Sequence, residues 1–226
     1  MILRTLVAPL LGACCHVLVD DDRCVVVDPG AGVADDVVAL VEREGWRPAG
    51  VLLTHGHVDH TWDAAQLGER LGVAVHVHVE DAYRLEDPFG SLGPLGDQLA
   101  ALAGGAPPAP RDVVTFAADP GEPVPLVVGR GDAAVELRAL HSPGHTQGST
   151  VYLVTGDDGV PAALTGDVLF AGTMGRTDLP GGDGDAMART LSRLARLDPA
   201  TVIHPGHGGT STIAVELATN PYLRAT

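Results

Sequence analysis

Three histidines and one aspartate lie within the seven residues THGHVDH at positions 54–60. Histidine binds a metal ion through a neutral ring nitrogen and aspartate through a carboxylate oxygen, so this loop could hold more than one ion. An incidental polar loop is a poor explanation, because protonated imidazoles this close together would repel one another without a metal. The candidate ligands in the loop are His55, His57, Asp59 and His60.

Three more candidate ligands stand beside glycine at the boundaries of predicted strands. His145 lies in HSPGHTQGS just before the strand STVYLVT, Asp167 follows AALT in TGDVLF, and His207 follows TVI in HPGHGG. Loops at one edge of a sheet collect ligands from distant parts of a chain, and α/β scaffolds commonly build their sites in this way. We expect all seven candidates to meet at one edge.

Such a site could supply a nucleophile without a nucleophilic side chain. Two divalent ions about 3.5 to 4 Å apart lower the pKa of a bridging water, so that hydroxide forms at neutral pH. One ion can polarise a carbonyl oxygen while the other receives a leaving thiolate. A thioester suits this chemistry, because its leaving group needs little protonation and the sequence shows no dedicated general acid. Ser142 and Cys24 lack a matching base and orienting group, so we expect water to be the nucleophile.

The elements that must position these ligands alternate between strand and helix. CCHVLV and CVVV form a predicted hairpin across the acidic turn DDD, and the segments that follow predict helix, strand, helix and strand up to VAVHVHVE. Further strands are AVELRAL, STVYLVT, AALTGDVLF and TVIHPG, with AMARTLSRLARL and IAVEL as helices. The pattern predicts the α/β class. Residues 86–121 are rich in Pro, Gly and Ala, and we expect an irregular surface excursion there.

Composition limits the range of partners. A chain of 226 residues that is 45% hydrophobic can bury one sizeable core, so we expect a single domain over 1–226. Acidic residues number 29 against 14 basic ones, a formal charge of −15, which disfavours nucleic acid and anionic lipid as partners. All the basic residues are arginine, so no lysine can form a Schiff base or anchor a phosphate. The sequence makes no prediction of oligomeric state.

The amino-terminal stretch MILRTLVAPLLGAC could pass for a lipoprotein signal that ends at Cys14. However, its apolar run LVAPLL is only six residues long and is broken by Pro9. No window approaches the length of a membrane span. The three cysteines have no metal-binding or disulfide spacing, which fits small buried residues in a reducing compartment. We therefore expect a cytoplasmic protein without a membrane partner.

The motifs together resemble those of the metallo-β-lactamase superfamily, and within it the compact hydroxyacylglutathione hydrolases of the glyoxalase II type. The resemblance is carried, in order, by VVVDPG, THGHVDH, HSPGHTQGS, TGDVLF with AGTMGRTDLPGGD, HPGHG and TNPYL. This combination is far more specific than any one motif. It implies a four-layer αβ/βα sandwich with a binuclear metal site at one edge. It also implies hydrolysis of a small hydroxyacyl thioester, such as S-lactoylglutathione, by a metal-bridging hydroxide.

The resemblance also assigns ligands to each ion. The first ion would be held by His55, His57 and His145, the second by Asp59, His60 and His207, with Asp167 bridging both. Asp59 and Asp167 would also be the catalytic residues. We expect two divalent ions, with zinc as the first choice and iron or manganese as alternatives, because histidine and carboxylate ligands do not select sharply among these metals.

Alternatives to this function stay open. Longer glyoxalase II enzymes carry an additional helical domain with basic residues that bind glutathione, whereas this chain ends soon after His207 and has no lysine. A different thiol carrier is therefore compatible with the same chemistry. A persulfide dioxygenase shares the fold and would use one iron, held here by His55, His145 and Asp167. A metal-binding module without catalysis is a third possibility. Lactam hydrolysis is disfavoured, since those enzymes usually lack the bridging aspartate.

Several other polar residues receive a structural interpretation. The interpretations are a packed or solvated pair for His76 and His78, loop support or ordinary hydrogen bonding for His141 and His204, turn formation first and support of the ligands second for Asp28, and an ion pair or a substrate contact for Arg176 with Asp178.

Overall fold

The structure is a computed structural model that describes residues 1–224. Its first sheet has six strands in the order β1-β2-β3-β4-β5-β6. β1 to β3 are antiparallel neighbours, and β3 to β6 are parallel. The strands are β1 (Ile2–Val7), β2 (Cys14–Asp20), β3 (Arg23–Val27), β4 (Arg47–Leu52), β5 (Val75–His78) and β6 (Val113–Phe116).

The second sheet has the order β14-β13-β10-β9-β8-β7 and is antiparallel except for the parallel pair β10 and β13. Its strands are β7 (Val124–Val128), β8 (Val135–His141), β9 (Thr150–Thr155), β10 (Pro161–Gly166), β13 (Val202–Pro205) and β14 (Ser211–Thr212). A short ribbon of β11 (Leu169–Phe170) and β12 (Thr173–Met174) follows β10.

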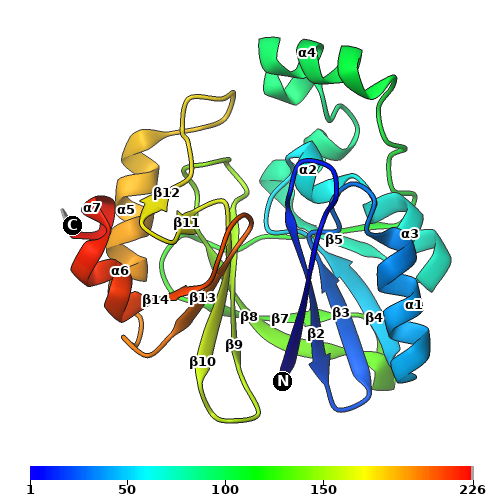
Figure 1. The fold of residues 1–226 in the computed structure, drawn as a ribbon, viewed down its shortest axis with the longest axis horizontal. Helices are drawn as coiled ribbons and strands as arrows, with labels where there is room; N and C mark the ends of the chain where they lie inside the picture. Colours follow the sequence, from blue (N-terminus) through cyan, green and yellow to red (C-terminus); the bar gives the residue numbers. More distant parts are fainter. Residues whose placement is uncertain (225–226) are drawn as a thin grey trace.

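Helices cover the outer faces of the two sheets (Figure 1). α1 and α3 pack on the first sheet, whereas α5, α6 and α7 pack on the second. The helices are α1 (Ala34–Glu44), α2 (Val58–Thr61), α3 (Ala64–Leu71), α4 (Pro94–Ala103), α5 (Gly184–Leu194), α6 (Ile213–Thr219) and α7 (Pro221–Arg224), with short 3₁₀ turns η1 (Val79–Leu85), η2 (Gly90–Leu92) and η3 (Gly131–Ala133). The predicted four-layer αβ/βα sandwich is confirmed.

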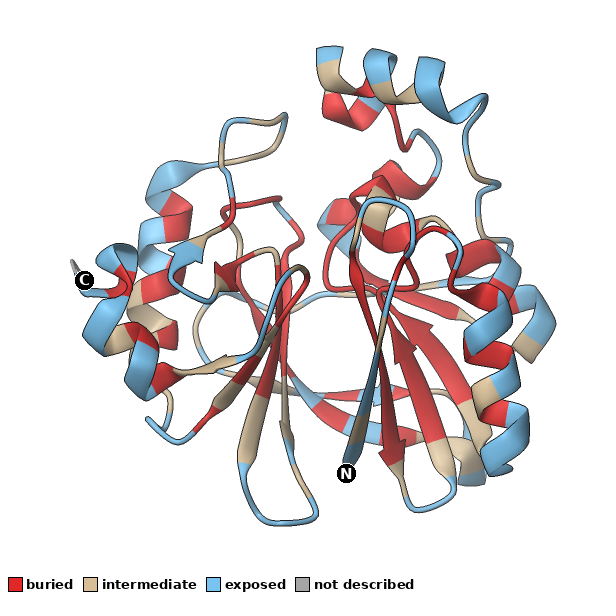
Figure 2. Cartoon of the chain, viewed as in Figure 1, coloured by how far each residue is buried: buried red, intermediate tan, exposed pale blue. Residues whose placement is uncertain are grey.

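The central strands of the first sheet are buried on both faces (Figure 2). Along β3, Cys24 and Val26 face the helical layer, while Val25 and Val27 face the second sheet. Such strands are continuous runs of β-branched residues, because both faces need apolar side chains. The three cysteines are free and buried, as the sequence predicted.

A buried side-chain hydrogen bond helps to join the two sheets at the end where the chain enters the histidine loop. The hydroxyl of Tyr152 in β9 donates to the carbonyl oxygen of Leu53, which follows β4, over 2.6 Å. Tyr152 is fully buried, and its burial raises the pKa of the phenol well above the ordinary value. The proton therefore stays on the oxygen, and the bond fixes the position of the residue directly before Thr54.

The structure corrects the expected irregular excursion over 86–121. Residues 94–103 form α4, and 113–116 form β6, which pairs in parallel with β5. The proline and glycine that suggested a loop are helix ends: Pro94 occupies the first turn of α4, and Gly104 follows it in a left-handed conformation. β6 owes its conformation to pairing with a strand about 35 residues earlier, which no local pattern reveals.

The amino-terminal stretch is also ordered into the fold. Residues Ile2–Val7 form β1, which pairs along its whole length with β2. Cys14 lies buried at the start of β2. Among the residues that the structure describes, no helix is long and apolar enough to cross a bilayer.

The inter-sheet hydrogen bond can be tested by Tyr152→Phe. The change leaves the buried carbonyl of Leu53 without its donor, and we expect the free energy of unfolding to fall by about 1 to 2 kcal/mol. Urea denaturation should show a lower midpoint at an unchanged slope. Tyr222→Phe is the matched control, because Tyr222 is 44% exposed, and its midpoint should equal that of the parent. Equal midpoints for both variants would show that the bond contributes nothing.

Candidate metal centre

All seven predicted ligands lie together where the two sheets meet. Four of them follow β4 in the loop and α2, while the others lie between β8 and β9, directly after β10 and shortly after β13. Backbone hydrogen bonds join these segments, since Thr150 donates to Thr54 and Gly206 donates to Gly166. The site is therefore assembled at the edge that the sequence predicted, near α2 in Figure 1.

His55, His57 and His145 form one buried group. Nδ1 of His57 lies 2.8 Å from Nε2 of His145. The ring centroid of His55 is 4.9 Å from that of His57 and 4.8 Å from that of His145. His145 donates from Nδ1 to the carbonyl oxygen of Arg176 over 2.8 Å, so its Nε2 presents a lone pair to the group.

Asp59, His60 and His207 form a second group. Oδ2 of Asp59 lies 3.1 Å from Nε2 of His207 and 3.6 Å from Nε2 of His60. His207 donates from Nδ1 to the carbonyl oxygen of Gly12 over 3.1 Å, which aims its other nitrogen at Asp59. One potential ligand atom from each of the three side chains therefore lies within 4.8 Å of the other two.

Asp167 lies between the two groups. Its Oδ1 is 3.3 Å from Nε2 of His60, and its Oδ2 is 3.7 Å from Nε2 of His145 and 3.8 Å from Nε2 of His207. Both carboxylate oxygens therefore face nitrogens of different groups. This position suits a residue shared by two cations.

The first group is electrically neutral. Burial, followed by the neighbouring imidazoles, lowers the pKa of His55 well below the ordinary value and that of His57 to about 3. Burial also lowers the pKa of His145. These rings are unprotonated at neutral pH, and neutral imidazole is the form that binds metal ions.

The second group carries charge. Burial disfavours a charged His60, but Asp167 and Asp59 outweigh it and raise the pKa of that imidazole well above the ordinary value. A hydrogen bond to Asp59 likewise raises the pKa of His207. Burial acts to raise the pKa of the Asp59 and Asp167 carboxyls. The neighbouring His60 outweighs this effect and holds both pKa values below the ordinary value. The two carboxylates thus attract positive charge, which a divalent cation would supply with release of protons.

Asp28 sets the orientation of two rings. Its side chain is buried, and its backbone has a left-handed conformation with φ 51°. Oδ2 accepts from Nδ1 of His60 over 3.1 Å and from Oγ1 of Thr54 over 2.6 Å, and Thr54 in turn accepts from Nδ1 of His55 over 3.0 Å. Both rings are thereby left with Nε2 facing the centre. The sequence predicted a turn role for Asp28 first and support of the ligands second, and it gave Thr54 no role, although such outer contacts govern ligand orientation.

A second buried carboxylate, Asp81 in η1, ties two ligand loops together. Oδ2 accepts from the amide of Gly56 over 2.8 Å and from Oγ1 of Thr146 over 2.7 Å, while Oδ1 accepts from the amide of Gly148 over 2.9 Å. Gly56 lies between His55 and His57, and Thr146 follows His145. Asp81 therefore fixes the distance between the loops of the first group.

Arg84 completes this connection and is fully buried. It donates from Nε to Asp81 over 3.2 Å, and from Nη2 to Oε1 of Gln147 over 2.8 Å and to the carbonyl oxygen of Pro180 over 2.9 Å. Nothing in the sequence marked this pair as functional. The stretch EDAYRL looks like an ordinary charged surface turn, and only the tertiary fold brings it under the histidine loop.

The donor atoms fit metal ions by a simple test. Within residues 1–224, eight buried side-chain nitrogens and oxygens have no hydrogen-bond partner, and half of them belong to this one centre: Nε2 of His55, His57 and His60 and Oδ1 of Asp167. Buried polar atoms without partners are rare in folded proteins, and each is explained by a strained site, a water or an ion. Imidazole nitrogen and carboxylate oxygen are the donor set of zinc and similar divalent ions.

The remaining histidines lie outside this arrangement. His78 stacks on His141 with ring centroids 4.0 Å apart, and Nε2 of His141 already donates to the carbonyl oxygen of Gln147. The two rings pack rather than form a further set of ligands, although Glu80 is close. His204 meets His16 edge-on. Arg176 and Asp178 form an exposed ion pair.

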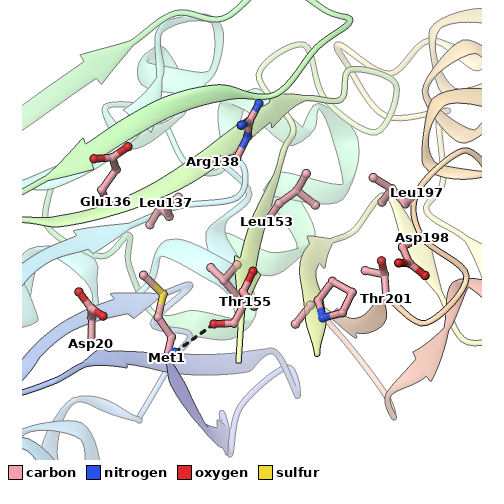
Figure 3. Close-up of a pocket in the computed structure, with 13 residues that line it drawn as sticks. Met1, Asp20, Glu136, Leu137, Arg138, Leu153, Thr155, Leu197, Asp198 and Thr201 are labelled. Atoms are coloured by element: carbon pink, nitrogen blue, oxygen red, sulfur yellow. Dashed lines mark hydrogen bonds between the residues drawn. The ribbon is translucent and has the colours of Figure 1, made fainter. Parts of the chain in front are cut away.

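A hollow of about 570 Å³ lies away from the seven candidate ligands (Figure 3). Met1, Thr155 and Pro161 line it, so it sits where β9 ends and β10 begins. Asp167 follows the opposite end of β10, roughly 17 Å away at the rise of an extended strand. The hollow is therefore remote from the seven candidate ligands, and size alone does not identify the functional site.

The role of Asp81 predicts a specific effect of Asp81→Asn. The amide cannot accept all the bonds of the carboxylate, so we expect unfolding free energy to fall by about 2 to 4 kcal/mol and zinc affinity to fall roughly tenfold or more. Zinc affinity is measured by competition with a fluorescent chelator, and stability by urea denaturation.

Glu216→Gln is the matched control for Asp81→Asn. Glu216 is a buried carboxylate that accepts from Gly172, Ser211 and Asn220 and from none of the seven candidate ligands. We expect this variant to lose stability with zinc affinity retained. Equal zinc affinity in both variants would contradict a positioning role for Asp81.

Comparison with known proteins identifies the family. The family model described as the metallo-beta-lactamase superfamily matches residues 10–207. A Mycobacterium tuberculosis protein is 38% identical over 99% of this chain and 98% of its own length. Hydroxyacylglutathione hydrolase GloC of Haemophilus influenzae is 32% identical over 93% of this chain and 92% of its own.

Solved structures are similar over nearly the whole chain. The BLEG-1 B3 metallo-beta-lactamase superposes with a TM-score of 0.80 at 26% identity, covering 98% of this chain and 99% of that one. TTHA1623, solved in a di-iron-bound form, superposes with a TM-score of 0.76 at 31% identity, covering 97% and 100%. ETHE1 from Myxococcus xanthus shares the fold, with a TM-score of 0.72 at 24% identity, covering 100% and 86%. With its fold, its buried His and Asp groups and this match, the chain belongs to the metallo-β-lactamase superfamily.

Proposed function

We propose that the protein is a binuclear metallo-hydrolase that cleaves a hydroxyacyl thioester to a carboxylate and a free thiol. His55, His57 and His145 would hold one divalent ion, Asp59, His60 and His207 the other, and Asp167 would contact both. The observation that carries the proposal is the presence of two complete donor groups with one carboxylate between them. The similarity to a hydroxyacylglutathione hydrolase supports the choice of thioester.

The side chains of this site provide no nucleophile of their own. Oγ of Ser142 is buried and donates to the carbonyl oxygen of Leu140. Burial raises the pKa of Cys24 to about 12 and also raises that of Cys14. None of these three side chains is activated by a nearby base, so water is the nucleophile that this chemistry leaves.

Two bound divalent ions would supply Lewis acidity, which lowers the pKa of water and polarises a carbonyl group. The protein contributes orientation. Asp28 and Thr54 hold Nδ1 of His60 and His55 and so aim the Nε2 atoms of both rings inward, and Gly12 does the same for His207. Asp59 and Asp167 stay ionised as ligands, and the protons displaced from the second group would be released to solvent. A thiolate needs little protonation, in keeping with the lack of an oriented general acid among these residues.

Zinc is the metal we propose, with iron or manganese as alternatives. The donors are nitrogen and oxygen, which all three ions accept. TTHA1623, at 31% identity, has been solved with two irons, so the same donor set can suit iron in a relative. Elemental analysis after expression with each metal supplied decides between them.

The reaction is tested by giving metal-replete protein two substrates. We expect loss of S-lactoylglutathione with release of thiol, at a rate unaffected by strict exclusion of oxygen. Glutathione persulfide should cause no oxygen uptake. Oxygen consumption with persulfide, without thioester cleavage, would replace the hydrolase by the mononuclear iron dioxygenase.

The variant Asp59→Asn distinguishes the hydrolase from the dioxygenase, because the two functions need different ligands. The change damages only the second group, while His55, His145 and Asp167, the three ligands a dioxygenase needs, stay intact. We expect metal content to fall from about two ions to about one per chain and thioester hydrolysis to fall by two or more orders of magnitude. Asp167→Asn is the comparison and should weaken binding of both ions. Full activity of Asp59→Asn with one iron would support the dioxygenase.

A further inference from the structure

An apolar cleft of about 320 Å³ opens beside the metal centre, between α2, α4 and the turn that joins β1 to β2. None of the residues that line it is charged. The principal walls are Leu10 and Leu11 of the turn, Val58 and Trp62 beside the centre, and Leu99 and Leu102 of α4. Pockets of this size accommodate small-molecule ligands.

The cleft keeps large apolar side chains in contact with solvent. Leu10 is 61% exposed, Leu11 51% and Leu102 85%. Isolated exposed leucines are common, but three around one hollow form a contiguous apolar surface of the kind found at binding sites. Leu11 is also held at φ 67°, a left-handed conformation that is unfavourable for a residue other than glycine. The turn therefore presents this side chain to the cleft at a conformational cost.

Both walls of the cleft continue into the metal centre. α2 places Val58 and Trp62 on the cleft, while Asp59, between them in sequence, faces His207. In the other wall, Leu11 is followed by Gly12, whose carbonyl oxygen accepts from Nδ1 of His207. The cleft and the centre therefore share α2 and the turn at 10–12 as neighbouring walls.

We infer that this cleft binds the hydrocarbon part of the acyl group, an inference that rests on the proposed thioester hydrolysis. The thiol carrier is a poor occupant, because low-molecular-weight thiols such as glutathione carry charged groups, and burying these against apolar walls is costly. No arginine lines the cleft, and the chain has no lysine. The substrate is then a thioester with an extended aliphatic or aromatic acyl group, and its thiol carrier points towards solvent.

The inference is tested with a series of acyl thioesters from acetyl to octanoyl on one uncharged carrier, N-acetylcysteamine. We expect kcat/KM to rise about threefold to fourfold for each added methylene until the cleft is filled. Equal kcat/KM along the series would overturn the inference while leaving the proposed function in place. Failure to hydrolyse any member, with S-lactoylglutathione still cleaved, would also overturn the inference, whereas failure with both kinds of substrate would contradict the proposed function.

Binding without catalysis gives an independent measurement. Trp46→Phe leaves Trp62, in the cleft wall, as the single tryptophan. We expect the S-octyl thioether of N-acetylcysteamine, which cannot be hydrolysed, to change its fluorescence at lower concentration than the S-ethyl thioether. Equal midpoints for the two thioethers would overturn the inference even if the enzyme proved to have another reaction.

Variants of the walls locate the effect. Replacing Leu10 and Leu102 together by serine removes two exposed side chains, and we expect the ratio of octanoyl to acetyl kcat/KM to fall about tenfold. Val215→Ser is the matched control, since Val215 is 49% exposed in α6, and the ratio should stay at the parent value. A ratio that is unchanged in the wall variant, together with a parent dimer that this variant converts to a monomer, would assign the cleft to a second copy of the chain.

Discussion

The arrangement of the centre depends on one buried carboxylate, that of Asp28. It accepts the amide and the hydroxyl of Thr54 and the Nδ1 proton of His60, and through Thr54 it also fixes the ring of His55. Because each imidazole has only one proton when neutral, anchoring Nδ1–H leaves Nε2 free for a cation. The left-handed backbone of Asp28 turns its carboxylate back under the histidine loop. Asp28, the residue directly after β3, therefore sets the orientation of the His55 and His60 rings in the centre.

The two donor groups differ in charge, and this difference follows from what surrounds each. Burial keeps the three imidazoles of the first group neutral, whereas Asp59 and Asp167 concentrate negative charge on the second. A buried carboxylate pair needs a counter-charge, which the histidines supply by protonation or a cation supplies directly. The two halves of the centre would therefore offer a cation different donors, neutral imidazoles in the first group and charged carboxylates in the second.

Much of the fold and the candidate ligands could be predicted from the sequence, because metal ligands have a restricted chemistry and the strands follow simple apolar patterns. His55 and His207 could be singled out by residue type and by their places after predicted strands. Asp81 and Arg84 could not, since their role exists only where η1 meets the loops at 56 and 146–148. α4 was missed because its capping residues, Pro94 and Gly104, also mark loops. β6 was missed because its partner strand is distant in sequence.

The proposed ligands come from both sheets, which has a consequence for the dynamics of the whole molecule. His57 follows β4 of one sheet and Asp167 follows β10 of the other, so a cation held by both groups is a cross-link between the two halves of the sandwich. The stability gained from such an ion grows with the logarithm of its concentration. That gain is shared by both sheets rather than confined to the loops. Amide hydrogens at the ends of β4 and β10 would then exchange with solvent in a correlated manner, governed by a common opening of the edge.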